Sequence, residues 1–441
     1  MLLLSWLLSA LAAPLPLDDV LSSVDAHMPA LQAAAAKIDA AEAKLLAARG
    51  AFDPTLSGKS SQYGGSDPRS ASVLSLGSET MLGPSWEAGI RRSTGSLKPY
   101  ETELETGTDG EWFARVEAPL DALLLPDSRA ALAVASAGAE IAEQAFADKR
   151  LSLRYKASAA YWKWAGSGAK RSVEQAQLDL ADDRIAALTR QVEEGSAPRM
   201  DLVDARRALL ERQARVLAAQ ADLDVAAQIL ALYYRDDAGM PVIATEDQLP
   251  LLDTPASDAA LDELLEIGTA RRPDLLALDQ ELEAARVTLR RQQLAMLPDA
   301  TLIGQVADDR ELDKTEWLAG VELKVPLLLR KDRGKLGAAQ AEVARLEAER
   351  VWLADQIGAQ IRNAWTAAAA ASAQATLMAD AAAQAEEVLQ MERRRYELGD
   401  TDLFKLLLRE DKLAEVTKYL AAAQAEAQIR QAALERVVGA R

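Results

Sequence analysis

The chain of 441 residues is long enough for two or three domains, and it combines 27% charged residues with only 5% aromatic residues. Together with abundant alanine, this composition is typical of long helices packed side by side rather than of an ordinary enzyme core. The net charge of -18 excludes a nucleic-acid partner, because phosphate binding requires clustered Lys and Arg. Since the chain has no cysteine, disulfides, thiolate metal sites and a cysteine nucleophile are excluded as well.

The N-terminal segment has the pattern of a secretory signal peptide. Its apolar run, residues 2–13, is too short to cross a bilayer as a helix, which takes roughly 20 residues. Ala10-Leu11-Ala12 matches an A-x-A cleavage site, so we expect a signal peptide at residues 1–12. No Lys or Arg precedes the apolar run, which leaves a buried N-terminal helix as the alternative. Because no later apolar run approaches 18 residues, we expect an exported protein that could span a membrane only with strands.

The sequence is internally duplicated. Leu17-Asp18-Asp19-Val20-Leu21 opens the first copy, and Leu261-Asp262-Glu263-Leu264-Leu265 opens the second. Helical periodicity could align the leucines of the two copies by chance, but it does not align glycines, prolines and tryptophans as well. The matched positions include Pro29 with Pro273, Pro54 with Pro298, Trp112 with Trp317, Tyr161 with Trp365, Gly195 with Gly399, and Leu202 with Leu406.

Each copy is predicted to contain an opening helix, a β-region, a long helix, a glycine-marked turn and a return helix. At 1.5 Å per residue a long helix would measure roughly 100 Å, so we expect the opening and return helices to stack end to end along it. The predicted segments are a signal peptide (1–12), first opening helix (13–54), first β-region (55–128), first helical hairpin (129–237), linker (238–260), second opening helix (261–297), second β-hairpin (298–330) and second helical hairpin (331–441).

The first return helix carries apolar residues at heptad spacing, which predicts close packing against a neighbouring helix. These residues are Leu202, Leu209, Val216, Leu223 and Leu230, with alanines at 205, 219 and 226 between them. The charged residues Arg206, Arg207, Glu211 and Arg212 are expected to mark the solvent side.

The β-regions alternate apolar and polar residues, as strands of a membrane barrel do. Trp317, Ala319, Val321 and Leu323 alternate with Leu318, Gly320, Glu322 and Lys324. A half-buried strand of a soluble sheet would give the same pattern. Trp86, Trp112 and Trp317 are candidate anchors at the membrane borders. The first β-region contains two additional strand-like segments, 73–82 and 86–92, followed by a polar loop through Pro99 and Gly110. The extra segments could be barrel strands, a loop or a plug.

The sequence predicts no catalytic, cofactor-binding or metal site, and therefore no enzyme. His27 is the only histidine, which excludes histidine-based triads and HExxH zinc sites. No GxxxxGK[ST] phosphate loop occurs.

Several doubled motifs resemble the TolC-like outer membrane efflux protein family over essentially the whole chain. They are the two Leu-Asp-Asp/Glu-x-Leu openings, Phe52-Asp53-Pro54-Thr55-Leu56, the Val-Glu strands running into Pro119-Leu120 and Pro326-Leu327, and the turns at Gly195 and Gly399. The resemblance implies a mostly α fold with a β-barrel contribution. Internally duplicated long helical hairpins would form a periplasmic α-barrel, and the strands would belong to a trimeric outer-membrane β-barrel.

The same resemblance implies a function. The protein would be a homotrimer in the outer membrane with a large periplasmic portion, needing no cofactor. It would act as the passive exit duct of a tripartite efflux or type I secretion system, with a periplasmic adaptor and an inner-membrane pump. Two other classes stay open, a periplasmic coiled-coil scaffold and an adaptor. An adaptor should have one helical hairpin without duplication, and a scaffold would not need alternating strands with tryptophans.

In such proteins the glycine-marked turns form the periplasmic tips, where the tunnel begins. By position this places Gly195, Arg199, Asp201, Gly399, Asp400, Thr401 and Asp402 at the entrance. Family members carry aspartates just after the second turn, whereas this sequence has Lys405 and Leu408. Asp411, with Asp400 and Asp402, could supply a shifted acidic ring. Each of these carboxylates could equally be part of a solvated turn.

Overall fold

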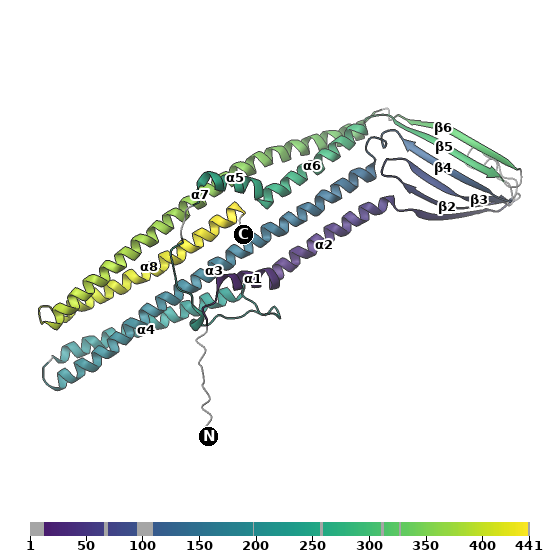
Figure 1. Ribbon diagram of the computed structural model, residues 1–441. Helices are drawn as coiled ribbons and strands as arrows, with labels where there is room; N and C mark the ends of the chain where they lie inside the picture. Colours follow the sequence, from purple (N-terminus) through teal and green to yellow (C-terminus); the bar gives the residue numbers. More distant parts are fainter. Residues whose placement is uncertain are drawn as a thin grey trace, which may run out of the picture. The chain divides into compact units, whose positions relative to one another are not determined.

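The computed structural model describes residues 13–65, 69–94, 109–196, 198–255, 259–309, 313–325 and 328–439. The predicted signal peptide lies outside these residues. The chain forms two compact units (Figure 1). The first, here called the helical unit, comprises Met1–Ala34, Phe146–Pro273 and Ala354–Arg441. The second, the sheet unit, comprises Ala35–Ala145 and Asp274–Leu353.

Two long helices and two return helices form as predicted. The long helices are α3 (Asp127–Glu193, 67 residues) and α7 (Arg330–Glu397, 68 residues), and the return helices are α4 (Arg199–Ala231) and α8 (Leu403–Val438). Gly166 lies within the uninterrupted α3. A Cβ at this position would lie 2.9 Å from the Cβ of Ala425, so the glycine lets α8 approach α3 closely.

Each opening helix is divided in two, whereas the sequence predicted one continuous helix per copy. The first copy has α1 (Leu17–His27) and α2 (Pro29–Arg49), and the second has α5 (Leu261–Arg271) and α6 (Pro273–Leu294). The break falls on the residue before a proline, where Met28 has ψ 116° and Arg272 has ψ 121°. The proline ring excludes the α conformation from the preceding residue, and both copies break for this reason.

Within the helical unit, each short opening helix meets the end of the return helix of its own copy. The hydroxyl of Ser23 in α1 donates to the carbonyl of Arg235 (2.9 Å) and accepts from its amide (2.7 Å), just beyond α4. In the second copy, Arg272 donates to the carbonyl of Val437 at the end of α8 (3.3 Å). The predicted end-to-end arrangement is therefore present at both junctions.

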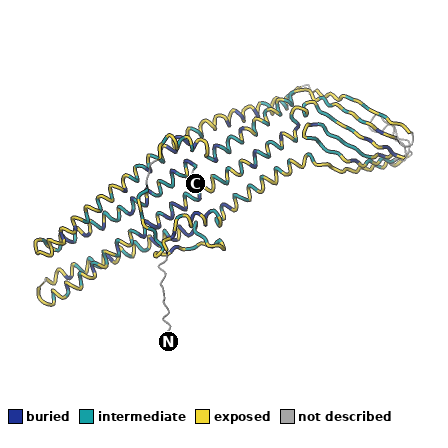
Figure 2. The backbone as a smooth tube through the Cα atoms, viewed as in Figure 1, coloured by how far each residue is buried: buried dark blue, intermediate teal, exposed yellow. Residues whose placement is uncertain are grey.

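The main apolar core of the helical unit lies between α1, α3 and α4 (Figure 2). Its fully buried members include Val20 and Val24 of α1, Trp164 of α3 and Leu230 of α4. Burying a side chain of this size stabilises the fold by about 1.5–3 kcal/mol. The described residues of the predicted linker are irregular apart from a short 3₁₀ turn (η2, Glu246–Gln248) and an isolated bridge from Pro241 to Arg235. The amide of Leu15 donates to the carbonyl of Gln248 (2.8 Å).

The described residues of the sheet unit form one antiparallel sheet of six strands in sequence order. A short 3₁₀ helix (η1, Gly50–Phe52) precedes it. The two additional strand-like segments are real strands, β2 and β3, inserted between β1 and β4. The predicted polar loop that follows them falls mostly outside the described residues. The strands are β1 (Thr55–Tyr63), β2 (Arg69–Glu79), β3 (Ser85–Thr94), β4 (Glu111–Pro119), β5 (Asp299–Asp309) and β6 (Lys314–Lys324).

The pairing of β4 with β5 joins the strands of the two copies. Long helices with a small antiparallel sheet match the predicted fold class.

Candidate channel surfaces

The two glycine-marked turns have the same backbone geometry. Gly195 (φ 72°) and Gly399 (φ 77°) adopt the left-handed conformation that residues with a side chain rarely take. After α3, the amide of Ser196 donates to the carbonyl of Gln191 (2.8 Å) and that of Gly195 to Val192 (3.1 Å). The turn after α7 repeats both bonds, from Asp400 to Arg395 (2.9 Å) and from Gly399 to Tyr396 (3.0 Å). Each long helix therefore ends in a Schellman motif.

Asp402 caps the helix that follows the second turn. Its carboxylate accepts from the amide of Lys405 (2.9 Å) and lies 3.3 Å from the Lys405 ammonium. The backbone hydrogen bond from Lys405 is the main reason that the pKa of Asp402 lies below its ordinary value. Thr401 donates to Glu392 of α7 (2.6 Å). The second turn thus holds a charged carboxylate in a fixed position.

The first turn is less constrained by side chains. Arg199 and Asp201 are exposed in the first helical turn of α4, and Pro198 occupies the N-cap position without a side-chain cap. The structure thus brings the predicted entrance residues together at two turns, apart from Asp411. Gly195, Arg199 and Asp201 lie at the first turn, and Gly399, Asp400, Thr401, Asp402 and Lys405 at the second.

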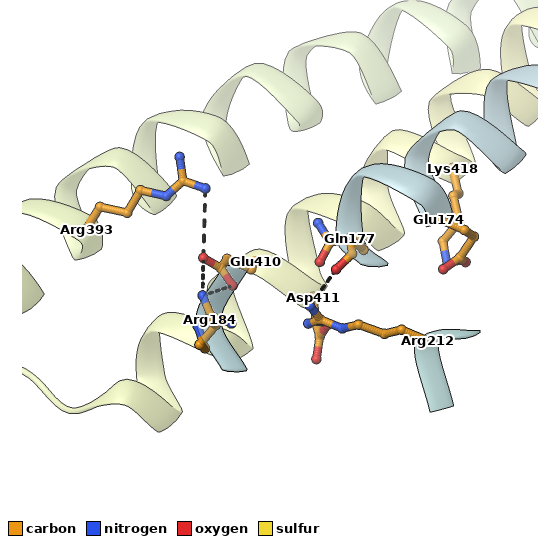
Figure 3. A network of polar contacts seen from close by, with 8 residues as sticks. All are labelled: Glu174, Gln177, Arg184, Arg212, Arg393, Glu410, Asp411 and Lys418. Carbon is orange, nitrogen blue, oxygen red and sulfur yellow. Dashed lines mark hydrogen bonds and ion pairs between the residues drawn. The ribbon is translucent and has the colours of Figure 1, made fainter. Parts of the chain in front are cut away.

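Asp411 lies further along α8 and takes part in an ion pair between hairpins (Figure 3). Its carboxylate accepts from Arg212 of α4 at 3.0 Å. Arg212 also donates to the backbone carbonyl of Gln177 in α3 (2.9 Å), and it is 4% exposed. The Asp411 side chain remains 52% exposed. One arginine therefore connects both helices of the first hairpin to the second hairpin.

A second buried group, Glu410, links the same two hairpins (Figure 3). Its carboxylate oxygens accept from Arg184 of α3 at 2.8 and 3.0 Å, and Arg393 of α7 lies 3.8 Å away. Glu410 is only 2% exposed. Further along, Lys418 of α8 pairs with Glu174 of α3. Because buried charges are costly without partners, these pairs restrict how the hairpins can separate.

The sequence interpretation missed this network and placed Arg212 on the solvent side, which is wrong. Arg206, Arg207 and Glu211 are exposed, but Arg212 is buried. The heptad pattern contained the signal, because Arg212 continues the series formed by the contact positions 205, 219 and 226. An arginine at a buried contact position needs a carboxylate or carbonyl partner, because an unpaired buried charge is costly.

One face of the sheet is apolar across all six strands. Residues paired in an antiparallel sheet point to the same side, so the register defines complete rows. One such row is Leu56, Leu76, Ala88, Ala114, Val306 and Trp317. Several of its large members are well exposed, with Leu56 at 69% and Trp317 at 75%. An exposed apolar surface of this extent marks a site of contact with another apolar phase.

The three predicted anchor tryptophans all point to this face. Trp112 is 52% exposed, and its row continues through Asp308 and Thr315, so it lies beside a polar border. Along β6, Trp317 is the next residue on the apolar face after Thr315. Trp86 is half-buried and pairs with Val116 near the start of β3.

The opposite face of the sheet is polar. It carries Glu87, Arg115 and Glu117, and Arg115 and Glu117 form an ion pair at 2.6 Å. In the second copy it carries Gln305 and Glu322. The alternation predicted for the strands therefore separates an apolar face from a polar one.

Within the part of the chain that the structure describes, no helix is sufficiently long and apolar to traverse a lipid bilayer. The described residues also contain no cluster of three or more His, Asp or Glu side chains suited to a metal ion.

Solved structures with the same fold include three outer membrane proteins. VceC of Vibrio cholerae matches with a TM-score of 0.67 at 19% identity, covering 96% of each chain. The MtrE outer membrane channel of Neisseria gonorrhoeae, in its open state, matches with a TM-score of 0.68 at 16% identity, covering 96% of this chain and 89% of MtrE. The CmeC outer membrane channel of Campylobacter jejuni matches with a TM-score of 0.65 at 14% identity, covering 96% of this chain and 85% of CmeC. At these identities the likeness establishes the fold.

The sequence also matches a family model over its first copy. The family described as "Outer membrane efflux protein" matches residues 20–233, which contain the first copy from its opening helix through its return helix. Over this first copy the chain is similar to the outer membrane efflux protein family. No curated protein sequence matches the chain.

The match to the outer membrane efflux protein family confirms two predictions. The resemblance seen in the doubled motifs is correct, and the chain is a transport protein rather than an enzyme.

Proposed function

We propose that three copies of this chain form the outer-membrane exit duct of a tripartite efflux or type I secretion system. The duct is a passive conduit, and an inner-membrane pump with its periplasmic adaptor supplies energy and selects the cargo. Residues 1–12 direct export, and most of the mature chain lies in the periplasm.

The observation that carries this proposal is the sheet with one apolar face and two open edges. The sheet ends in β1 on one side and β6 on the other, each with one row of backbone groups outside the pairing. In lipid such groups must be satisfied, which only a closed barrel achieves for strands. With six alternating strands, β1 and β6 run in opposite directions. β6 of one copy can therefore pair antiparallel with β1 of the next, as barrels of this kind require.

The rotational symmetry of such a ring explains why one chain would carry two different edges. Head-to-tail contacts between identical copies close into a ring when the rotation fits. The apolar row through Leu56, Leu76 and Trp317 would then face lipid, and the polar face with Glu87, Arg115 and Glu322 would line the pore.

We assign the entrance to the two Schellman turns. Asp400, Asp402 and Lys405 at one turn, and Arg199 and Asp201 at the other, are exposed charged groups on well-defined backbone. The ion pairs of Arg212 and Glu410 hold the two hairpins that carry these turns together. The adaptor would dock at the same turns.

Fractionation followed by gel electrophoresis of unheated and boiled membrane extracts tests this proposal. We expect a species that needs detergent for extraction from the outer membrane and runs as a trimer until boiled. A monomer released with the soluble periplasmic fraction would contradict the channel and favour a periplasmic scaffold.

A further inference from the structure

The two copies contribute unequally to the sheet. Among the described residues, the second copy supplies a single hairpin, β5–β6, and the first supplies four strands. The difference is the hairpin β2–β3, which lies between β1 and β4 and pairs with both along nearly its whole length. Its register runs from Thr55↔Gly77 to Tyr63↔Arg69 on one side, and from Ser85↔Glu117 to Arg91↔Glu111 on the other. β2–β3 is therefore part of the wall of the sheet.

The inserted hairpin also follows the same division of faces as its neighbours. Leu74 (47% exposed), Leu76 (42%) and Ile90 (40%) lie on the apolar face. Ile90 pairs with Leu74 and with Trp112 of β4. Strands of a loop or a plug, surrounded by water, would have no reason to continue an apolar face in register with the rest of the sheet.

Buried polar contacts fix the hairpin to β4 on the opposite face. Arg91 of β3 and Glu111 of β4 form an ion pair, and each is 3% exposed. The Arg91 guanidinium lies 5.1 Å from the centre of the Phe113 ring. Val73 of β2 packs against Phe113 and Ala307 of β5. These contacts join β2, β3, β4 and β5 at one end of the sheet.

Two glycines of the hairpin allow its strands to approach very closely. A Cβ at Gly89 would lie 2.3 Å from the carbonyl oxygen of Leu74, and a Cβ at Gly77 would lie 2.7 Å from that of Trp86. Both glycines belong to the polar face, since they pair with Ser75 and Glu87. Glycine at such positions lets a sheet bend toward that face, as closure into a barrel requires.

We infer that the trimer closes a barrel of eighteen strands, with β2–β3 of each protomer in the lipid-facing wall, and that its lumen admits polymer-sized cargo. This inference rests on the proposed function, because it assumes three protomers in one barrel. If each of the two sequence repeats in a protomer supplied only one hairpin, the same trimer would have twelve strands. Eighteen strands place the barrel in the size range that leaves an aqueous channel.

The additional strands enlarge the lumen considerably. With strands about 4.8 Å apart and tilted by roughly 40°, eighteen strands give a backbone diameter of roughly 36 Å, against roughly 24 Å for twelve. A helical polypeptide is about 10–12 Å across. The barrel would therefore admit a polypeptide without close contact with the wall, and size selection would belong to the entrance.

Cysteine labelling tests the position of the hairpin, because the chain has no cysteine of its own. Single variants would place cysteine on the apolar face of the inserted hairpin (Leu74→Cys, Ile90→Cys) and on its polar face (Glu87→Cys). Matched variants in β6 provide controls for the two faces (Val321→Cys, Glu322→Cys). Each trimer, in proteoliposomes, is treated with a membrane-impermeant maleimide.

We expect Glu87→Cys and Glu322→Cys to react at least tenfold faster than Leu74→Cys, Ile90→Cys and Val321→Cys. If Leu74→Cys and Ile90→Cys react as fast as Glu87→Cys while Val321→Cys stays protected, the hairpin is outside the wall and the inference is wrong, although the channel stands. If Val321→Cys reacts as fast as Glu322→Cys, the proposed membrane barrel fails, and the inference fails with it.

Electron cryomicroscopy of the unaltered trimer gives an independent count that requires no variant. Eighteen strands around the three-fold axis support the inference. A wall of twelve strands, with β2–β3 above or inside it, would overturn it.

Discussion

Tyr161 and Trp365 occupy equivalent positions in the two copies and donate to equivalent backbone carbonyls. The Tyr161 hydroxyl donates to Leu15 (2.6 Å), two residues before α1, and the Trp365 indole donates to Ala259 (3.1 Å), two residues before α5. Two different side chains thus fix the start of the opening helix in the two copies. The duplication conserves the hydrogen bond while the donor has changed.

Replacing Tyr161 by phenylalanine should destabilise the helical unit. Tyr161 is 2% exposed and Leu15 is 4% exposed, so the variant would leave a buried carbonyl without its donor. Such a loss costs about 1–3 kcal/mol. Thermal unfolding followed by circular dichroism should show a lower midpoint for Tyr161→Phe. Tyr419→Phe is the control, because Tyr419 is 58% exposed and should be neutral. Equal midpoints for Tyr161→Phe and the unaltered protein would contradict the assigned role.

The same tyrosine predicts a loss of stability at alkaline pH. Burial raises the pKa of Tyr161 from 10.0 to about 12. Because the folded-state pKa is the higher one, this contribution is fully present below pH 10 and is lost as pH rises toward 12. Ultraviolet absorbance of tyrosinate should therefore include one phenol that ionises near pH 12. If this ionisation is missing from the titration of Tyr161→Phe, it belongs to Tyr161. If the titration of Tyr161→Phe is unchanged, the assignment to Tyr161 is wrong.

Removing Glu410 should be far more damaging than removing an exposed carboxylate of the same helix. Glu410→Ala leaves Arg184, whose side chain is 17% exposed, without its partner, and breaking a buried pair in this way costs about 3–5 kcal/mol. Glu415 pairs with Lys412 at the surface, with side chains 47% and 60% exposed. Glu415→Ala should leave the unfolding midpoint nearly unchanged, because a solvent-exposed ion pair contributes little to stability. Comparable midpoints for the two variants would show that the network does not hold the hairpins together.

Alanine should have opposite effects at two glycines of the second copy. Gly399 has φ 77°, so Gly399→Ala should destabilise the turn by about 1 kcal/mol. Gly337 lies inside α7 with open space around a Cβ, so Gly337→Ala should stabilise the helix by about 1 kcal/mol. The comparison of unfolding midpoints tests the sign directly. A higher midpoint for Gly399→Ala would contradict the Schellman geometry, and a lower midpoint for Gly337→Ala would contradict the open space around that glycine.

The sequence predicted the elements whose signals are long and repeated. The long helix of the first predicted hairpin (129–237) is present as α3, because no proline or turn signal interrupts the periodic pattern before Gly195. The alternation around Trp112 and Trp317 likewise predicted the two faces of the sheet, which the register confirms. Both predictions were stronger because the same pattern occurs in each of the two sequence copies.

Other features of the fold depend on single residues within a periodic stretch, or on contacts between segments far apart in the sequence. Pro29 and Pro273 lie within stretches whose periodic pattern predicts continuous helix, although each proline excludes the α conformation from the residue before it. The buried state of Arg212 depends on Asp411, 199 positions further along the chain. The placement of β2–β3 in the sheet depends on pairing with β1 and β4, because an alternating segment alone fits a wall, a loop or a plug.

Conductance of the purified protein across a planar lipid bilayer tests the central claim most directly. We expect detergent-purified trimers to insert and produce discrete steps of uniform size, whereas boiled, dissociated protein should produce none. If trimers incorporated into the bilayer left its conductance unchanged, and Glu410→Ala trimers with a loosened hairpin network did the same, the chain would not form a channel.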